Sequence, residues 1–198
     1  MTKHVSPIGK YVFGALIEPR TNAFGISQWT VGLVLQEDEA QPLFTLIEEA
    51  LEAKRVGNPR FPATNEGLKM PFFPGTKLLP DGTREEIPGE FLFKFARKLE
   101  RKTKTGEVTR NTPPAIYDSL GRVINGKVDQ IGGGSTGKAV FEIYVYDNGG
   151  IRGVTLQLLG FQIAELKTRE LELPPIEGGF VAEQSEDDDI AAVLAGNA

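Results

Sequence analysis

The chain has 198 residues, of which 40 % are hydrophobic, and a formal net charge of −5 at pH 7. This length and apolar content favour one domain with a full core. The chain has no cysteine, and its single histidine, His4, lies near the N-terminus, which argues against a disulfide framework, a thiolate metal site and a Ser–His or Cys–His nucleophile pair. There is neither a long apolar run nor a signal-peptide pattern, so we expect a cytoplasmic protein.

Charge is distributed unevenly along the chain. After Arg169 there is no Lys or Arg, and residues 170–198 carry eight of the 27 acidic residues. The other 19 acidic residues stand against 22 basic residues in residues 1–169, so the body carries about +3 and the tail −8. This asymmetry predicts a basic binding body followed by a disordered acidic tail at 170–198. A solubilising tail on an ordinary acidic protein is the alternative.

The first elements are two strands and a helix. Alternating apolar residues predict strands over 10–18 and 27–36. In the second of these, four apolar residues share one face: Trp29, Val31, Leu33 and Leu35. The period then changes to that of an amphipathic helix over 37–57, which Gly57 ends.

The rest of the chain predicts strands separated by long loops. Residues 57–90 contain six of the 13 prolines and are expected to form a long irregular insertion. Strands are expected at 91–99, at 138–146 and at 151–163, with a short extended piece at 113–117. The last two long strands form a hairpin across Asp147–Gly150, and the slipped alternation at Leu158–Leu159 predicts a bulge. A sandwich and a small Greek-key barrel both fit this order of elements.

The stretch GGGSTGKAV at 132–140 matches seven positions of a phosphate-binding loop. The eighth position, which should carry a magnesium-binding hydroxyl, is Ala139. A strand pattern follows where that motif requires a helix. We therefore interpret the glycines as a flexible loop before a strand. Nucleotide hydrolysis stays a minor alternative.

Catalysis by acidic residues has little support in the sequence. Asp118 and Asp129 lie in turn-rich stretches, where aspartate usually bonds its own backbone. The body shows no spaced carboxylate cluster of the kind that holds a metal. We expect no enzyme activity, no metal, no cofactor and no small-molecule substrate.

Single-stranded nucleic acid is bound by cations that follow the phosphates and by aromatic rings on which bases stack. Both kinds of side chain occur together here, although strand aromatics often belong to a core and strand lysines often protect an edge. The expected phosphate contacts are Lys69, Lys94, Arg97, Lys98, Arg101, Lys102, Lys104, Arg122 and Lys138. The expected stacking residues are Trp29, Phe72, Phe73, Tyr117, Tyr144 and Tyr146. By contrast, Phe91, Phe93 and Phe95 are expected in the core.

Several pieces of the chain resemble one family. They are GKYVFGALIEP at 9–19, PDG at 80–82 followed by GEFLFKFARK, PPAIYDSLG at 113–121, and the glycine-rich strand pair at 132–166. In order and spacing, most of residues 8–167 is similar to the OB-fold single-stranded DNA-binding proteins of tailed phages, a family long catalogued as a domain of unknown function. The resemblance implies a mainly β fold at 1–169 with one five-stranded OB-type Greek-key barrel. It also implies sequence-independent binding of single-stranded DNA in phage replication or recombination.

Acidic tails are common in single-stranded DNA-binding proteins, and the bacterial ones end in Asp-Asp-Asp-Ile-Pro-Phe. This tail contains Asp187, Asp188, Asp189 and Ile190, but the Pro-Phe ending is absent. We expect the tail to contact phage or host replication proteins in the cytoplasm of an infected cell and to compete with DNA for the body. A structural phage β protein, such as a head or tail component without DNA binding, is the alternative.

Overall fold

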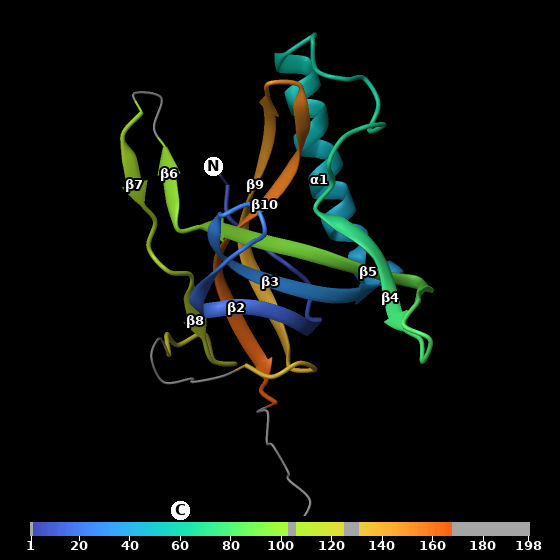
Figure 1. Cartoon of the computed structure of the whole chain (residues 1–198), viewed down its shortest axis with the longest axis vertical. Helices are drawn as coiled ribbons and strands as arrows, with labels where there is room; N and C mark the ends of the chain where they lie inside the picture. Colours follow the sequence, from blue (N-terminus) through green and yellow to red (C-terminus); the bar gives the residue numbers. More distant parts are fainter. Residues whose placement is uncertain (1, 103–105, 125–130, 168–198) are drawn as a thin grey trace, which may run out of the picture.

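The computed structural model describes residues 2–102, 106–124 and 131–167. These ranges contain the helix α1 (Glu37–Gly57). The strands in chain order are β1 (His4–Val5), β2 (Gly9–Thr21), β3 (Ser27–Gln36), β4 (Phe72–Leu78), β5 (Arg84–Lys98), β6 (Glu100–Lys102), β7 (Val108–Arg110), β8 (Ala115–Tyr117), β9 (Thr136–Asn148) and β10 (Ile151–Glu165). Figure 1 shows β2, β3 and β5 crossing the β9–β10 pair, with α1 to one side.

Five strands close a ring in the order β9, β2, β3, β5, β10 and back to β9. Each neighbouring pair is antiparallel except β5 and β10, which run parallel. Closure leaves few unpaired strand edges, which is how small β barrels satisfy their backbone groups. The predicted mainly β, OB-type architecture with one helix is confirmed.

The inward sides of the ring strands form the core. The four residues of β3 predicted to share a face are each exposed by 3 % or less: Trp29, Val31, Leu33 and Leu35. From β5, Phe93 and Phe95 are fully buried, and the Phe95 ring packs on Phe141 of β9 with ring centroids 5.2 Å apart. The period of two read from the sequence therefore identifies the core side of these strands.

The helix lies where its periodicity predicts, directly after β3. Its buried residues are Ala40, Leu43, Ile47 and Leu51, one stripe along the helix. The helix begins with a capping box in which the Glu39 carboxylate accepts from the backbone N–H of Gln36 at 3.1 Å. This stripe joins the barrel core, so α1 covers part of the ring.

The glycine-rich stretch closes the barrel. β2 pairs with β9 only through Gly9 with Gly137 and Lys10 with Thr136. A Cβ at Gly137 would lie 2.5 Å from the Phe161 ring, so glycine permits this close approach. The buried Ser135 hydroxyl donates to the Gly132 carbonyl at 2.8 Å and fixes the turn before the strand. A strand follows the glycines, as predicted. The close contact with Phe161 gives Gly137 a structural role.

The segment 57–90 is more ordered than the sequence predicts. β4 pairs with β5, which begins at Arg84 instead of residue 91, and a turn at 79–83 joins the two strands. Asp81 accepts hydrogen bonds from the backbone and the hydroxyl of Thr83, and these bonds lower the pKa of its carboxyl. The prediction of one long irregular insertion was wrong because this hairpin is exposed and carries no apolar alternation. In the sequence, this hairpin is indicated only by its turn residues, Pro80, Asp81 and Gly82.

The strand predictions for the C-terminal half of the chain agree with the structure. The hairpin of β9 and β10 and the bulge between Leu158 and Gly160 are confirmed, and β8 lies within the predicted extended piece. No helix in the described part of the chain is long and apolar enough to cross a membrane. Among the same residues, no group of three or more acidic or histidine side chains is placed to hold a metal.

Candidate nucleic-acid interface

The outward side of β2, β3 and β5 carries cations and an aromatic ring. Because β3 pairs with β2 on one side and β5 on the other, the outward residues line up in rows across the three strands. One row is Phe13, Gly32 and Lys94; another is Arg20, Gln28 and Lys98, and Thr30 lies in the row between them. We name this surface the groove face, defined by Phe13, Arg20, Gln28, Thr30, Lys94 and Lys98.

An irregularity in β2 turns Phe13 outward. Residues two apart on a regular strand point to the same side. Here the register shifts between Tyr11 and Phe13, so Tyr11 stays in the core at 5 % exposure while Phe13 is 41 % exposed. A Cβ at Gly32 would lie 2.5 Å from Cε1 of the Phe13 ring. The ring therefore lies against bare backbone of β3, with its outer side in solvent.

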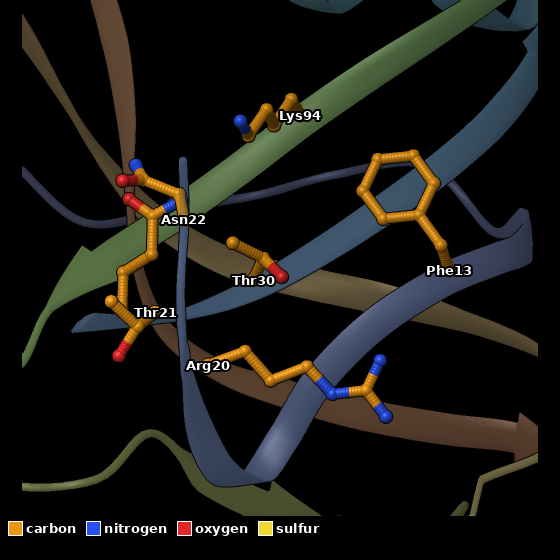
Figure 2. Close-up of a pocket in the computed structure, with 7 residues that line it drawn as sticks. Phe13, Arg20, Thr21, Asn22, Thr30 and Lys94 are labelled. Carbon is orange, nitrogen blue, oxygen red and sulfur yellow. The ribbon is translucent and has the colours of Figure 1, made fainter. Parts of the chain in front are cut away.

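A shallow pocket of about 180 Å³ lies beside this ring. Figure 2 shows Thr30 at its centre, with Phe13 on one side, Asn22 and Thr21 on the other, and Lys94 and Arg20 at opposite ends. The arrangement places an apolar ring and two cations around one hollow. Such a combination suits a stacked base with its neighbouring phosphates.

The cations of the groove face are free to bind an anion. Arg20, Lys94 and Lys98 make no ion pair with any residue that the structure describes. Arg20, Lys94 and Lys98 are all exposed. Unpaired exposed cations keep their full attraction for phosphate, which gives the face a positive local potential in a protein of negative net charge.

The loop between β2 and β3 presents a second aromatic residue next to this pocket. Phe24 is 87 % exposed at the loop tip. The Asn22 side-chain oxygen accepts from the backbone N–H groups of Phe24 at 2.9 Å and Ile26 at 3.1 Å, and the backbone of Asn22 bonds Gly25 and Ile26. The loop is thus held by its own hydrogen bonds, and the exposed ring extends the aromatic surface beyond the groove face.

Three predicted residues lie on or beside the β9–β10 hairpin: Tyr144, Tyr146 and Lys69. Tyr144 is 40 % exposed, opposite Thr155, and the apolar residues Ile143 and Val145 beside it pack on the core, as predicted. A Cβ at Gly153 would lie 2.8 Å from the Tyr146 hydroxyl and 2.9 Å from Cβ of Lys69. Burial raises the pKa of the Tyr146 phenol above its ordinary value.

The structure corrects some of the predicted contacts. Trp29 is buried on the inward side of β3, so its assignment as a stacking residue was wrong. Phe72 packs on Phe44 with ring centroids 4.9 Å apart and belongs to an aromatic cluster beside α1. Arg97 is half-buried, and its Nε donates to the Thr112 carbonyl at 2.9 Å, so it secures the segment after β7.

Other predicted residues are placed elsewhere on the surface. Phe73 is 51 % exposed and opposite Leu92, on the outward side of β5. Tyr117 and Lys138 both pair with Gln162 in a separate group beside β8. Near them Arg122 donates to Asp118 at 2.7 Å. Arg101 is exposed on β6. The Lys102 side chain, Lys104 and the tail residues Asp187, Asp188, Asp189 and Ile190 lie outside the described residues.

Five residues of this interface were not predicted from the sequence: Phe13, Phe24, Arg20, Gln28 and Thr30. One signal was available for Phe13: Gly32 inside a strong strand pattern indicates that another group approaches the backbone closely. The alternation of β3 that places Trp29 on the inward side also predicts that Gln28 and Thr30 point outward. Gly14, which directly follows Phe13, is a second sign, because a glycine inside a strand often marks a bulge.

Several solved structures with a similar fold come from bacteriophages. The single-stranded DNA-binding protein encoded by bacteriophage T7 superposes with a TM-score of 0.62 at 25 % sequence identity, over 89 % of this chain and 99 % of that one. The fold is that of phage single-stranded DNA-binding proteins. No protein-family model and no curated protein matches the sequence.

A second phage protein extends this likeness. The single-stranded DNA-binding protein from bacteriophage Enc34, solved in complex with single-stranded DNA, has a TM-score of 0.60 at 14 % identity over 84 % of this chain. Its C-terminally truncated form has a TM-score of 0.59 at 12 % identity. This chain thus shares the fold of these phage proteins while most of its residues differ from theirs, and the predicted fold class is confirmed.

Proposed function

We propose that the protein binds single-stranded DNA independently of sequence on the groove face. The observation that carries this proposal is the row Phe13, Gly32 and Lys94, which sets an exposed ring beside an unpaired cation. Phosphates lie against Arg20, Lys94 and Lys98, and a base stacks on Phe13. The T7 and Enc34 proteins, described as single-stranded DNA-binding proteins, support the assignment because they share the fold.

The strand therefore runs across β2, β3 and β5, which is the surface that OB folds use for oligonucleotides. Tyr144 on β9 and Phe24 at the loop tip offer further stacking surfaces at the margins of this path. Lys69 lies beside Tyr146 and supplies a further phosphate contact.

The biological setting that fits this activity is phage replication or recombination in the cytoplasm of an infected cell. The acidic tail, residues 170–198, carries eight acidic residues and no basic one. It recruits phage or host replication proteins, and it competes with DNA for the basic body because it is tethered to it. Deletion of residues 180–198 tests the first role through loss of binding to a replication protein.

Fluorescence anisotropy of labelled oligo-dT, compared with duplex DNA of equal length, tests the proposal. We expect tight binding of oligo-dT, weak binding of duplex and a steep loss of affinity with salt. Replacing Arg20, Lys94 and Lys98 together by Ala should abolish binding, whereas Lys54→Ala on α1 should leave it unchanged. Equal affinity of the triple variant and the wild type would contradict the groove face as the site. No binding of either DNA would favour a structural phage protein.

A further inference from the structure

The two-stranded ribbon of β6 and β7 adds nothing to the core of the protein. It forms a sheet of its own, and Figure 1 shows it standing apart from the ring, on the side opposite α1. None of its described residues belongs to the core, and Val108 is 50 % exposed. A lone two-stranded ribbon is at best marginally stable in water. A binding role therefore explains this ribbon better than a structural one.

Both ends of the ribbon are fixed beside the groove face. Where it starts, the Leu99 backbone N–H donates to the Ser27 carbonyl at 2.9 Å, which continues the pairing of β5 with β3 one residue past Lys98. Where it ends, the Asn111 backbone N–H donates to the Leu99 carbonyl at 2.8 Å, and the Asn111 side-chain amide donates to the Lys98 carbonyl at 2.8 Å. The ribbon thus leaves the barrel at the Lys98 end of the groove face.

The ribbon carries an excess of positive charge. Residues 100–110 contain four basic and two acidic residues, a net charge of +2, whereas residues 1–169 together carry about +3. Arg101 and Arg110 are exposed, and neither makes an ion pair with a residue that the structure describes, although Arg110 lies opposite Glu100 in the ladder. Most of the positive excess of the body therefore lies on this short segment, with two of its cations free to bind an anion.

The chemistry of the ribbon fits the sugar-phosphate backbone of DNA better than a base or a protein surface. Residues 100–110 include no aromatic residue on which a base could stack. The buried centre of a protein interface is usually apolar, and Val108 is the only large apolar residue in this segment. Cations remain as its means of binding, and they attract phosphates without regard to sequence.

We propose that the β6–β7 ribbon is a second contact for single-stranded DNA, in which Arg101 and Arg110 bind phosphates of nucleotides that extend beyond the groove face at its Lys98 end. This inference rests on the proposed function, because it takes the strand to cross the groove face. The groove face then holds bases and phosphates, and the ribbon holds phosphates only. A short oligonucleotide fills the groove face alone, whereas a longer one also reaches the ribbon.

Affinity as a function of oligonucleotide length tests the proposal. Oligo-dT of about 4 to about 16 nucleotides, the range of site sizes for OB folds, is titrated by fluorescence anisotropy, and only lengths that bind one copy of the protein are compared. A double variant, Arg101→Ala with Arg110→Ala, should match the wild type on the shortest oligonucleotide that binds. On the longest it should lose about fivefold in affinity, the effect of two exposed charge contacts. Its salt slope should become less steep by about 1.4 on the longest oligonucleotide only.

Three further variants separate phosphate contact from other effects. Arg60→Ala with Arg84→Ala removes the same charge from exposed positions outside the ribbon, and it should not change the dependence on length. Arg101→Lys with Arg110→Lys keeps the charge, so it should retain most of the affinity for the longest oligonucleotide. Glu100→Gln should strengthen that binding by about twofold, because it removes the acid opposite Arg110. A purely structural role of the ribbon predicts no such gain.

Two results would overturn the proposal. If the Arg101 and Arg110 double variant bound every length as the wild type does, the ribbon would be left for a protein partner. If it lost the same factor at every length, its cations would not act on nucleotides beyond the groove face. Both results differ from a failure of the proposed function, because the shortest oligonucleotide reports the groove face alone. A lack of binding at every length would reject the groove face and the ribbon together.

Discussion

The ring of Phe13 on β2 lies against Gly32 on β3, where any larger residue would collide with it: a Cβ there would be 2.5 Å from Cε1 of the ring. Because glycine offers no side chain, the ring fits against β3 in the same row as Lys94, and Phe13 is 41 % exposed. A base can stack on such a ring, and each stacked base contributes about 1–3 kcal/mol.

We therefore expect Phe13→Ala to weaken oligo-dT binding by roughly 5- to 100-fold, which corresponds to that range of stacking energy. Gly32→Ala should also weaken binding, because the new methyl group displaces the ring without removing it. The matched control is Ile17→Ala, since Ile17 lies on the same strand and is 42 % exposed. Anisotropy titrations measure all three variants. If Ile17→Ala weakened oligo-dT binding as much as Phe13→Ala, the loss of affinity would come from a general disturbance of β2 and not from the lost ring.

Tryptophan fluorescence distinguishes the core from the groove face. Trp29 is 3 % exposed on the inward side of β3, so a base cannot stack on it. Saturation with oligo-dT should leave the emission of the wild-type protein nearly unchanged. Phe13→Trp should introduce a second emission that the DNA quenches strongly, because an indole ring at this position stacks on a base.

Strong quenching of wild-type Trp29 by DNA would contradict this assignment. It would mean that binding opens the barrel far enough to expose the inward side of β3. The duplex of equal length serves as the control ligand, and it should quench neither protein.

The contrast between Trp29 and Phe13 shows what the sequence could predict. Alternation on β3 identified the core, because the strand is regular and a period of two fixes the inward side. It should also have removed Trp29 from the stacking candidates, since Trp29 belongs to the same apolar set as Val31 and Leu33. The predicted Lys94 and Lys98 were placed correctly on the outward side by the same rule.

Phe13 could not be placed in this way because its direction depends on a bulge. A one-residue shift reverses every later side chain, and Gly14 signals a bulge in β2 without fixing which neighbouring residue the shift turns outward. The hairpin of β4 and β5 was missed for a related reason, since its exposed strands carry no apolar pattern. Contacts across strands, such as that of Phe13 with Gly32, depend on how neighbouring strands are aligned. A single sequence specifies this strand register only weakly.

The salt dependence of oligo-dT binding should show which individual cations contact phosphates. For single strands the slope of log affinity against log salt is about −0.7 for each phosphate contacted. Lys94→Ala and Lys98→Ala should each make the slope less steep by about 0.7, and the double variant by about 1.4. Lys77→Ala is the control, because Lys77 on β4 is already paired with Glu85 at 2.8 Å. Unchanged slopes in the Lys94 and Lys98 variants would remove these residues from the DNA path.

Acid should loosen the contact between α1 and the segment that follows it. The Asn65 amide and then Arg55 donate to Glu48, and these bonds lower the pKa of its carboxyl. A lowered folded-state pKa means that the stabilisation is complete above the unfolded pKa of about 4.3 and is lost as the pH falls through the folded value. Since Glu48 is half exposed, Glu48→Gln should lower the free energy of unfolding at pH 7 by only about 0.2–1 kcal/mol.

Urea unfolding at pH 7 and at pH 3 checks this expectation. The difference between the wild type and Glu48→Gln should shrink at the lower pH, where the wild-type carboxyl gains a proton. Glu49→Gln, at the next exposed position of α1, is the matched control variant, because the Glu49 side chain makes no ion pair with the described residues. A difference that grows on acidification would have the wrong sign for a carboxyl with a lowered pKa.

Removal of the acidic tail should strengthen DNA binding. Residues 170–198 carry −8 and the rest of the chain carries about +3. A tethered tail of this charge has a high effective concentration near the cations of the body, so it competes with phosphate for them. A protein that ends at residue 169 should bind oligo-dT about tenfold more tightly at 50 mM salt, and the gain should vanish near 500 mM because the competition is ionic.

The competing charge is tested separately from the length of the tail. A full-length variant in which Asp187, Asp188 and Asp189 are replaced by Asn keeps the tail but removes three of its charges, and it should bind with an affinity between those of the wild type and the truncated protein. Anisotropy titrations at both salt concentrations measure the three proteins. Equal affinities at low salt would show that the tail does not reach the groove face, and its role would then lie with protein partners alone.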